Sequence, residues 1–119
     1  MKIAISAMGN SLDAEVNQRF GRTRWLIIFE TENGEYEAID NSDNYNAPQG
    51  AGIKTADTVA KKGCKAVITG HLGPKAFTVL NRAGIKGYNC QSGTVQEAIE
   101  KYKNGQLTEI SSPDVKGHW

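Results

Sequence analysis

One stretch decides the fold, namely Lys65-Ala66-Val67-Ile68-Thr69-Gly70-His71-Leu72-Gly73-Pro74. Its apolar run is short and bounded by turn residues, which predicts a buried central strand of a parallel sheet. Pro74 then suits the first position of a helix, where proline loses no helical hydrogen bond. A strand that leads directly into a helix aims unpaired backbone N–H groups at the space beyond the strand, and this geometry suits an anion.

The same strand-to-helix alternation extends along the chain. We expect strands at residues 2–8, 25–29, 35–40, 65–69 and 85–90. Asn33-Gly34 predicts a hairpin between the second and third strands. Helices are expected after residues 52, 73 and 94. In the first of them, Ile53, Ala56, Val59 and Ala60 share one face.

Right-handed crossovers determine how these strands are arranged. With strands numbered along the chain, we expect an α/β fold with a five-stranded mixed sheet in the order 3-2-1-4-5. The second strand is antiparallel, and helices flank the sheet. The order reverses between the first and fourth strands, where open α/β sheets bind ligands. The loops after the first, fourth and fifth strands meet at this edge, as do the starts of all three helices.

Composition excludes several classes of protein. A net charge of +1, with 23% charged residues, argues against a dedicated nucleic-acid binder. No run approaches the ~20 apolar residues of a membrane span, and the N-terminal stretch lacks a signal peptide, so we expect a cytoplasmic protein with no membrane partner. Two cysteines do not make a disulfide framework. We expect one domain over residues 1–108 and a polar C-terminal tail over 109–119.

The densest basic cluster is Arg19-Phe20-Gly21-Arg22. If the loop after the first strand folds over the crevice, its guanidinium groups would face it. Arginine offers planar, multi-donor contacts to oxyanions and sulfido-anions. The alternative is a solvated loop with surface arginines.

Soft or borderline metal ligands are few. His71 lies at the expected switch point, where imidazole is a common ligand, although a lone histidine in a turn is also ordinary polar filler. Cys90 ends the last strand at the same edge, and its thiolate would be a soft ligand. Cys64 is expected to be a small buried hydrophobe at the opposite end. Met8 is either core or a thioether neighbour of the ligand.

The segment from residue 41 to 52 is long for a connection in a compact domain, which is typical of a binding segment. It ends in Gly50-Ala51-Gly52, where glycine lets the backbone approach a ligand closely. These glycines match neither a dinucleotide fingerprint nor a P-loop. No nucleophile elbow or catalytic carboxylate set is present either.

Four motifs together resemble a known family. They are Ser6…Leu12-Asp13…Val16…Arg19-Phe20-Gly21-Arg22; Gly50-Ala51-Gly52-Ile53; Thr69-Gly70-His71-Leu72-Gly73-Pro74-Lys75-Ala76; and Thr94-Val95-Gln96-Glu97-Ala98-Ile99. The pattern is similar to the dinitrogenase iron–molybdenum cofactor biosynthesis family over nearly the whole chain. The resemblance implies a ribonuclease-H-like α/β fold and non-catalytic binding of metal–sulfur clusters or their precursors.

Within that family, the loop at Thr69-Gly70-His71 is most similar to members that carry an anionic molybdenum–copper sulfide cluster. The resemblance then implies that Arg19 and Arg22 neutralise the cluster and that helix N-termini donate to its sulfides. Iron–sulfur and iron–molybdenum clusters are the alternatives. The expected cluster-binding residues are Ser6, Met8, Arg19, Arg22, Gly50, Gly52, Thr69, Gly70, His71, Gly73 and Cys90, with His71 and Cys90 as metal ligands.

Three hypotheses follow from these residues. The first is a cluster carrier without turnover of its own, with protein partners in cluster delivery or in a larger complex. The second is a regulatory or scaffold protein that acts through protein partners and holds a simple anion such as phosphate. The third is an enzyme acting on a phosphorylated small molecule, for which His71 would be the only general base.

Overall fold

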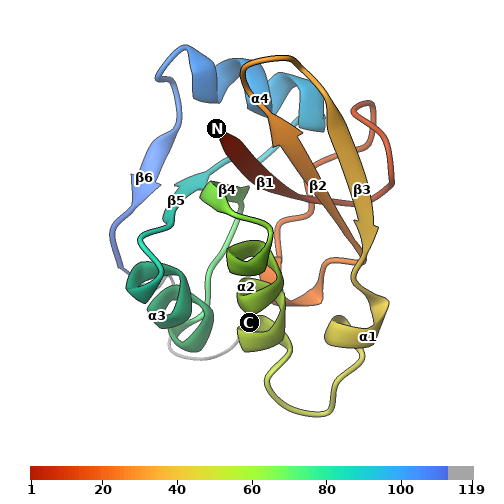
Figure 1. Ribbon diagram of the computed structural model, residues 1–119, viewed down its shortest axis with the longest axis vertical. Coiled ribbons are helices and arrows are strands. Elements are labelled where there is room, and N and C mark those ends of the chain that lie inside the picture. The colour runs from red at the N-terminus through yellow and green to blue at the C-terminus, as the bar shows by residue number, and fades with distance from the viewer. Residues whose placement is uncertain (113–119) are drawn as a thin grey trace.

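The computed structural model describes residues 1–112 of the protein. These residues form one mixed sheet with helices on both faces (Figure 1). The strands are β1 (Lys2–Ala7), β2 (Trp25–Glu30), β3 (Tyr36–Asp40), β4 (Cys64–Thr69), β5 (Lys86–Asn89) and β6 (Thr108–Ile110). The helices are the 3₁₀ turn η1 (Phe20–Arg22), α1 (Ser42–Tyr45), α2 (Ala51–Lys61), α3 (Pro74–Arg82) and α4 (Val95–Lys103).

The sheet order is β3-β2-β1-β4-β5-β6. β1 pairs antiparallel with β2 and parallel with β4, and β5 continues the parallel part. The expected α/β class and the order of the first five strands are therefore confirmed. The order reverses between β1 and β4, as the crossover argument requires.

The expected number of strands is wrong, because the sheet has six strands and not five. β6 pairs antiparallel with β5 and places Ile110 against Gly87. Only Ile110 of its three residues is buried, so β6 carries almost no hydrophobic pattern that could reveal it. β6 includes residues 109 and 110, which the sequence assigns to the tail, and residues 113–119 of that tail lie outside the described residues.

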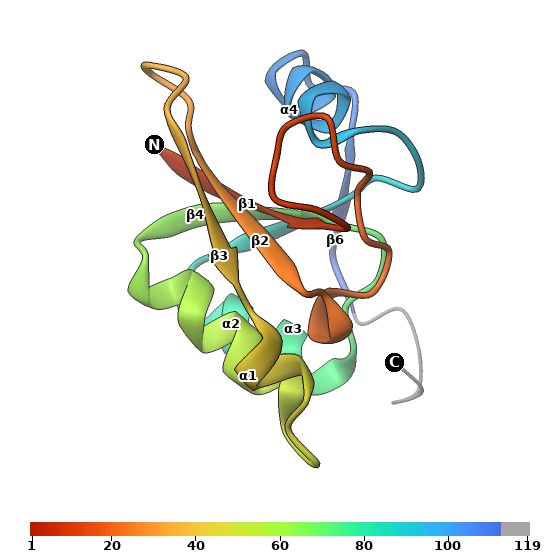
Figure 2. The ribbon, with the colours of Figure 1, turned by 90° about the vertical axis from the view of Figure 1, so that its right-hand side faces the viewer.

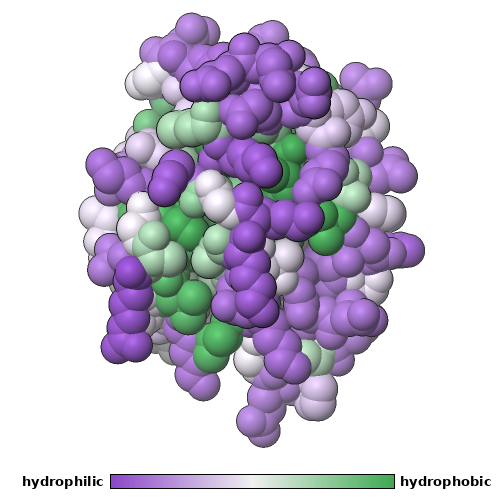
Figure 3. Space-filling model, viewed as in Figure 1, coloured by the Kyte–Doolittle hydropathy of each residue, from purple (hydrophilic) through white to green (hydrophobic). Residues whose placement is uncertain are grey.

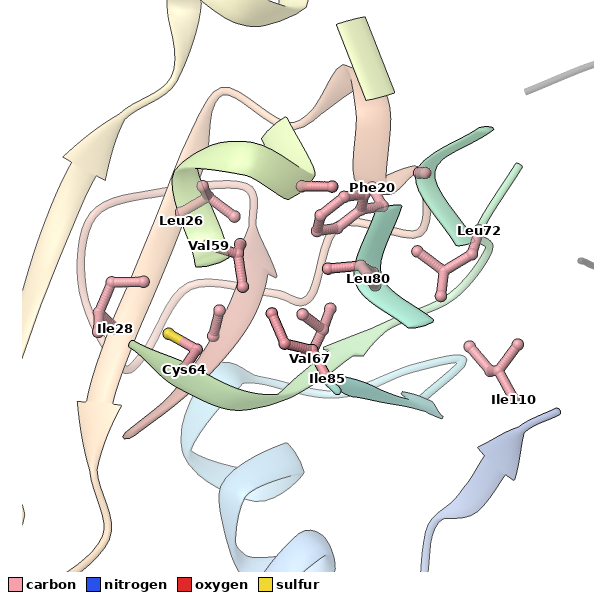
Figure 4. Packing of buried hydrophobic residues seen from close by; sticks show 13 residues of the cluster. Phe20, Leu26, Ile28, Val59, Cys64, Val67, Leu72, Leu80, Ile85 and Ile110 are labelled. Carbon is pink, nitrogen blue, oxygen red and sulfur yellow. The ribbon is translucent and has the colours of Figure 1, made fainter. Parts of the chain in front are cut away.

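The two faces of the sheet bury separate hydrophobic clusters. Figure 2 shows α2 and α3 on one face and α4 on the other. Because side chains alternate along a strand, β1 sends Ala4 to the α2–α3 side and Ile3 and Ile5 to the α4 side. Figure 4 shows the first cluster, in which Phe20 of η1 packs beside Leu80 of α3. Burial of Phe20 thus anchors η1 to the core beneath α2 and α3.

Three of the four residues expected on the buried face of α2 pack toward the core: Ala56 and Val59 are buried, and Ala60 is partly buried against the same cluster. The buried residues of α2 are Ala51, Thr55, Ala56 and Val59. Ile53, expected on that face, is 38% exposed. Small residues take the core positions because the helix lies close to α3 and η1. A Cβ atom on Gly52 would lie only 3.3 Å from Cβ of Ala76 in α3. Hydrophilic residues dominate the face seen in Figure 3, although some apolar side chains are visible over α2 and α3.

Within residues 1–112, none of the helices combines the length and the apolar character that crossing a bilayer would require.

Candidate functional site

A cavity of about 260 Å³ opens where η1 meets the starts of α2 and α3. In Figure 2, η1 is the orange turn on the same side of the sheet as α2 and α3. The lining residues are Arg19, Gly21, Arg22, Gly50, Ala51, Gly52, Ile53, His71, Gly73, Pro74, Lys75 and Ala76.

Three small residues let the lining segments approach one another. A Cβ atom on Gly21 would lie 3.1 Å from Cα of Gly52, so η1 rests directly on the α2 backbone. A Cβ atom on Gly52 would lie 3.3 Å from Cβ of Ala76, so α2 in turn rests on α3. The series Gly21, Gly52 and Ala76 therefore brings three segments together around one cavity.

The N-termini of α2 and α3 lack side-chain caps. The N-cap of α2 is Gly50, in the left-handed conformation with φ of 75°, and the N-cap of α3 is Gly73. Neither helix has a side-chain cap hydrogen bond or an acidic residue in its first turn. The first N–H groups of a helix have no partner within it and carry the positive end of its dipole. Both helices therefore aim positive ends at the cavity.

Helix α4 of the same chain has a capping box at its N-terminus. Thr94 Oγ1 accepts from the Glu97 N–H at 3.1 Å, and the Glu97 carboxylate accepts from the Thr94 N–H at 2.8 Å. The bond from the Thr94 backbone N–H to the carboxylate holds the pKa of Glu97 below its ordinary value. The capping box pairs first-turn N–H groups of α4 within the helix itself. The equivalent N–H groups of α2 and α3 have no such side-chain partner.

The charged side chains of the lining all have one sign. Arg19, Arg22 and Lys75 line the cavity, and no Asp or Glu of residues 1–112 is among the lining residues. Nη1 of Arg22 donates to the Tyr45 carbonyl oxygen at 2.8 Å, which orients the guanidinium. His71 pairs with Arg19 in an isolated parallel bridge, and its carbonyl oxygen accepts from the Phe20 N–H at 3.4 Å. The lining thus offers cations and N–H donors from three segments.

The crevice expected directly above β1 and β4 is filled by the chain itself. Residues 16–19 cross the carboxyl ends of these strands, with one bridge to Ala7 and another to His71. Ser6 Oγ lies 2.6 Å from the Asn17 carbonyl oxygen and 2.7 Å from Thr69 Oγ1. Ser6 and Thr69, both expected as cluster-binding residues, therefore hold this segment and do not line the cavity.

Three further expected residues lie away from the cavity. Gly70 makes room for the crossing segment, since a Cβ atom there would lie 2.7 Å from the Gln18 carbonyl oxygen. Cys90 is buried with the α4-side cluster, and its thiol donates to the Ser92 carbonyl oxygen at 3.3 Å. Met8 is 64% exposed and is not among the lining residues.

The other expected residues are brought together by the fold. Arg19, Arg22, Gly50, Gly52, His71 and Gly73 all line the cavity. The sequence analysis did not propose Gly21, Ala51, Ile53, Pro74, Lys75 or Ala76 as binding residues. All six belong to the quoted motifs. Helix starts that lack capping residues are the signal that could have identified Ala51, Lys75 and Ala76.

Neither cysteine of the chain lines the cavity. Cys64 is buried at the start of β4, and this burial raises the pKa of its thiol to about 11. No group of three or more His, Cys, Asp and Glu that could hold a metal ion occurs among residues 1–112. The cavity is therefore equipped to hold an anion by charge and hydrogen bonding, and His71 is the one histidine among its lining residues within 1–112.

Comparisons with known proteins agree on the family and the fold. The model of the dinitrogenase iron-molybdenum cofactor family matches residues 1–105. An uncharacterised protein of Methanocaldococcus jannaschii is 34% identical over 113 residues, which is 92% of each chain. The apo form of the orange protein from Desulfovibrio gigas superposes with a TM-score of 0.92, at 35% identity and 96% coverage of both chains. A proposed NifB protein from Thermotoga gives 0.86, at 34% identity and 98% coverage of both chains.

Proposed function

Because the chain belongs to the dinitrogenase iron-molybdenum cofactor family, we propose that it is a non-catalytic binding or carrier protein for an anionic metal–sulfur cluster or its precursor. One observation supports this most strongly. Three cationic side chains and two helix N-termini without side-chain caps surround one cavity whose described lining contains no carboxylate. A bound polyanion would satisfy all of these groups at once.

The proposed cluster is a molybdenum–copper sulfide. The resemblance of the His71 loop to cluster-carrying members of the family supports this choice, as does the 35% identity to the orange protein. Iron–sulfur and iron–molybdenum clusters are the alternatives that the family name supports. We include the ribonuclease-H-like classification and a cytoplasmic location in the proposal, with no nucleic-acid or membrane partner.

The donor set fits a cluster held mainly without covalent bonds to the protein. Guanidinium groups and backbone N–H groups can donate to sulfide, and they need no displacement of a ligand from the metal. A cluster held by cysteine thiolates fits poorly, because Cys64 and Cys90 are both buried away from the cavity. Of the two expected metal ligands, His71 lines the cavity and stays part of the proposal as a single ligand.

Reconstitution tests the proposal directly. The protein is purified without oxygen, its metals and visible spectrum are measured, and the metal-free form is titrated with tetrathiomolybdate and copper. We expect a coloured complex of fixed stoichiometry that Arg19→Ala and Arg22→Ala weaken. Arg82→Ala is the matched control, because Arg82 is an exposed arginine at the far end of α3.

Two results would overturn the cluster proposal. The first is that neither the purified nor the titrated protein takes up molybdenum, copper or an iron–sulfur species. The second is uptake that is equal in the Arg19→Ala, Arg22→Ala and Arg82→Ala variants, because the cluster would then lie elsewhere.

A second candidate is a scaffold protein that holds a simple anion at the same cavity. The backbone donors of α2 and α3 favour it, since helix N-termini bind phosphate as readily as other anions. Titration with inorganic phosphate distinguishes the two candidates. Phosphate binding that exceeds thiometallate binding, together with stable protein partners recovered from metal-free lysate, would favour the scaffold.

A further inference from the structure

Asn41 is a buried polar residue that the proposed function leaves unexplained. It begins the long segment between β3 and α2, and it is only 1% exposed. Burying a side-chain amide is costly unless its donors and acceptor are all paired. Its partners therefore show what the residue does.

The Asn41 side chain connects three segments. Nδ2 donates to the Thr23 carbonyl oxygen at 3.0 Å and to Thr55 Oγ1 at 3.0 Å. Oδ1 accepts from Nδ2 of Asn44 at 2.7 Å. Thr23 directly follows η1, Thr55 belongs to α2, and Asn44 belongs to α1. An asparagine amide supplies two donors and an acceptor at once, which no aspartate or serine could do here.

This network reaches the cavity at two points. The Thr55 hydroxyl donates to the carbonyl oxygen of Ala51, the first residue of α2, at 2.8 Å. Thr23 is the neighbour of Arg22 in the chain and accepts the other Asn41 hydrogen bond through its carbonyl oxygen. Ala51 and Arg22 both line the cavity. Asn41 thus links the η1 wall of the cavity to the α2 wall without touching the cavity itself.

We propose that Asn41 is a positioning residue of the anion cavity. It holds η1 and the first turn of α2 at the separation at which the Arg22 guanidinium and the α2 N–H groups face the same ligand. This inference rests on the proposed anion-binding function. A site held by locked supporting contacts binds better than one whose walls are free to separate, because less order has to be created on binding.

The sharpest test uses the threonine in the link. Thr55→Val keeps the side-chain shape and removes the hydroxyl that joins Asn41 to Ala51. We expect it to weaken tetrathiomolybdate binding about tenfold, and Thr55→Ser, which restores the hydroxyl, to rescue binding. Thr78→Val is the matched control. Its hydroxyl makes the same bond within a helix, to the Pro74 carbonyl oxygen at 2.9 Å, and Thr78 is exposed.

Asn41→Asp provides a second variant, since it keeps the shape and the acceptor but removes both donors. The proposal is overturned if Thr55→Val and Asn41→Asp bind within twofold of the wild type, or if Thr78→Val loses as much affinity as Thr55→Val. Ile99→Val serves as a control if its loss in unfolding free energy equals that of Thr55→Val. The proposal is also overturned if Ile99→Val then weakens binding as much as Thr55→Val does, because the effect would be general destabilisation. Ile99 is a buried residue of α4, on the other face of the sheet.

A spectroscopic arm separates this inference from the proposed function. Amide chemical shifts of Gly21 and Gly52 are recorded for the metal-free wild type, Asn41→Asp and Thr78→Val. Shifts caused by Asn41→Asp alone support the link between the walls, and their absence overturns it, whichever anion binds. A wild type that binds neither tetrathiomolybdate nor phosphate overturns the proposed function and leaves the link to be judged on these shifts.

Discussion

Arg19 and Arg22 reach the cavity from the two sides of one short turn, with Phe20 buried between them. Phe20 anchors the turn in the core, and Gly21 lets the turn rest on the backbone of α2. Each residue of Arg19-Phe20-Gly21-Arg22 therefore has a separate physical role. Both arginines line the cavity because Phe20 and Gly21, which lie between them, pack against the core and the α2 backbone.

Replacing Arg22 should reduce anion affinity more than its charge alone explains. Arg22→Ala removes a charged donor and also the bond that fixes Tyr45, so we expect a loss of about 1.5–3 kcal/mol in tetrathiomolybdate binding. Arg22→Lys keeps the charge and loses the fork of donors, and its affinity should be intermediate. Isothermal titration at low salt measures both losses. Equal affinities for wild type, Arg22→Ala and Arg82→Ala would contradict the prediction.

The Cys64 thiol should make stability depend on pH in the alkaline range. Burial raises its pKa in the folded state from 9.0 to about 11, so the neutral thiol stabilises the fold below pH 9. That contribution disappears as the pH rises from about 9 to about 11, and the linkage amounts to roughly 2 kcal/mol. Urea unfolding of wild type and Cys64→Ala at each pH measures it. The wild-type advantage should shrink across this window, and parallel pH profiles would contradict the assignment.

Two kinds of helix start coexist at the scale of elements. α4 satisfies its own first turn with Thr94 and Glu97, while α2 and α3 begin with glycine N-caps and no acid in the first turn. A glycine N-cap stabilises a helix only a few tenths of a kcal/mol less than Ser, Thr, Asp or Asn does, and an acid in the first turn adds about 0.3–1 kcal/mol. The starts of α2 and α3 lack both, which has a modest cost in stability. Binding an anion at those two starts would offset that cost.

A new cap on α3 should therefore raise the stability of the fold and weaken thiometallate binding. Gly73 has φ of −71° and ψ of 167°, an extended conformation that aspartate adopts without strain. Gly73→Asp would cap α3 and place a carboxylate in the cavity, so we expect stability to rise by up to about 1 kcal/mol. Thiometallate binding should fall at least tenfold, since the carboxylate repels the ligand and occupies its donors. Thermal unfolding and optical titration of the same preparation measure the two effects.

No such exchange between stability and binding is expected at α4. Thr94→Ala should cost about 1 kcal/mol in unfolding free energy, because the capping box is lost, and leave anion affinity unchanged. A Thr94→Ala variant that loses affinity would show that the cavity depends on the stability of the whole domain, and the distinction between open and capped helix starts would fail.

At the scale of the whole molecule, the sequence predicts topology better than it predicts the site. Strong periodicity and the handedness of crossovers determine the order of the first five strands, because each rule acts on long, patterned segments. β6 was missed because one buried residue, Ile110, carries its pattern. The crevice at Ser6 and Thr69 was predicted from a general rule, and an irregular segment over 16–19 fills it through hydrogen bonds that no periodicity encodes.

The same reasoning explains which site residues could be predicted. Arg19, Arg22 and His71 were expected beside a crevice above β1 and β4. They line a cavity at the nearby starts of α2 and α3 instead, because the crossing segment fills that crevice. Cys90 was assigned to the correct edge of the sheet, but its side chain points to the α4 face. The face that a strand-end side chain takes depends on register, which a short strand such as β5 specifies weakly.

Ligand binding should stabilise the entire domain, because the cavity joins η1, α2 and α3 and so engages the core around Phe20. At a free concentration of 100 times Kd, a ligand that binds only the folded state adds about 2.7 kcal/mol. For a chain of this length, that corresponds to a rise in Tm of roughly 10 °C.

Scanning calorimetry with and without tetrathiomolybdate measures this rise, and the salt dependence identifies its origin. The cations that line the cavity are screened over about 10 Å at 0.1 M salt and about 3 Å at 1 M, so the rise in Tm should diminish with added salt. The backbone N–H donors of α2 and α3 lie at the cavity wall and still bind the ligand at high salt, so part of the rise in Tm should remain. A Tm shift that vanishes in Gly73→Asp but survives in Thr94→Ala would place the ligand at the open helix starts. An equal shift in both variants would place it elsewhere.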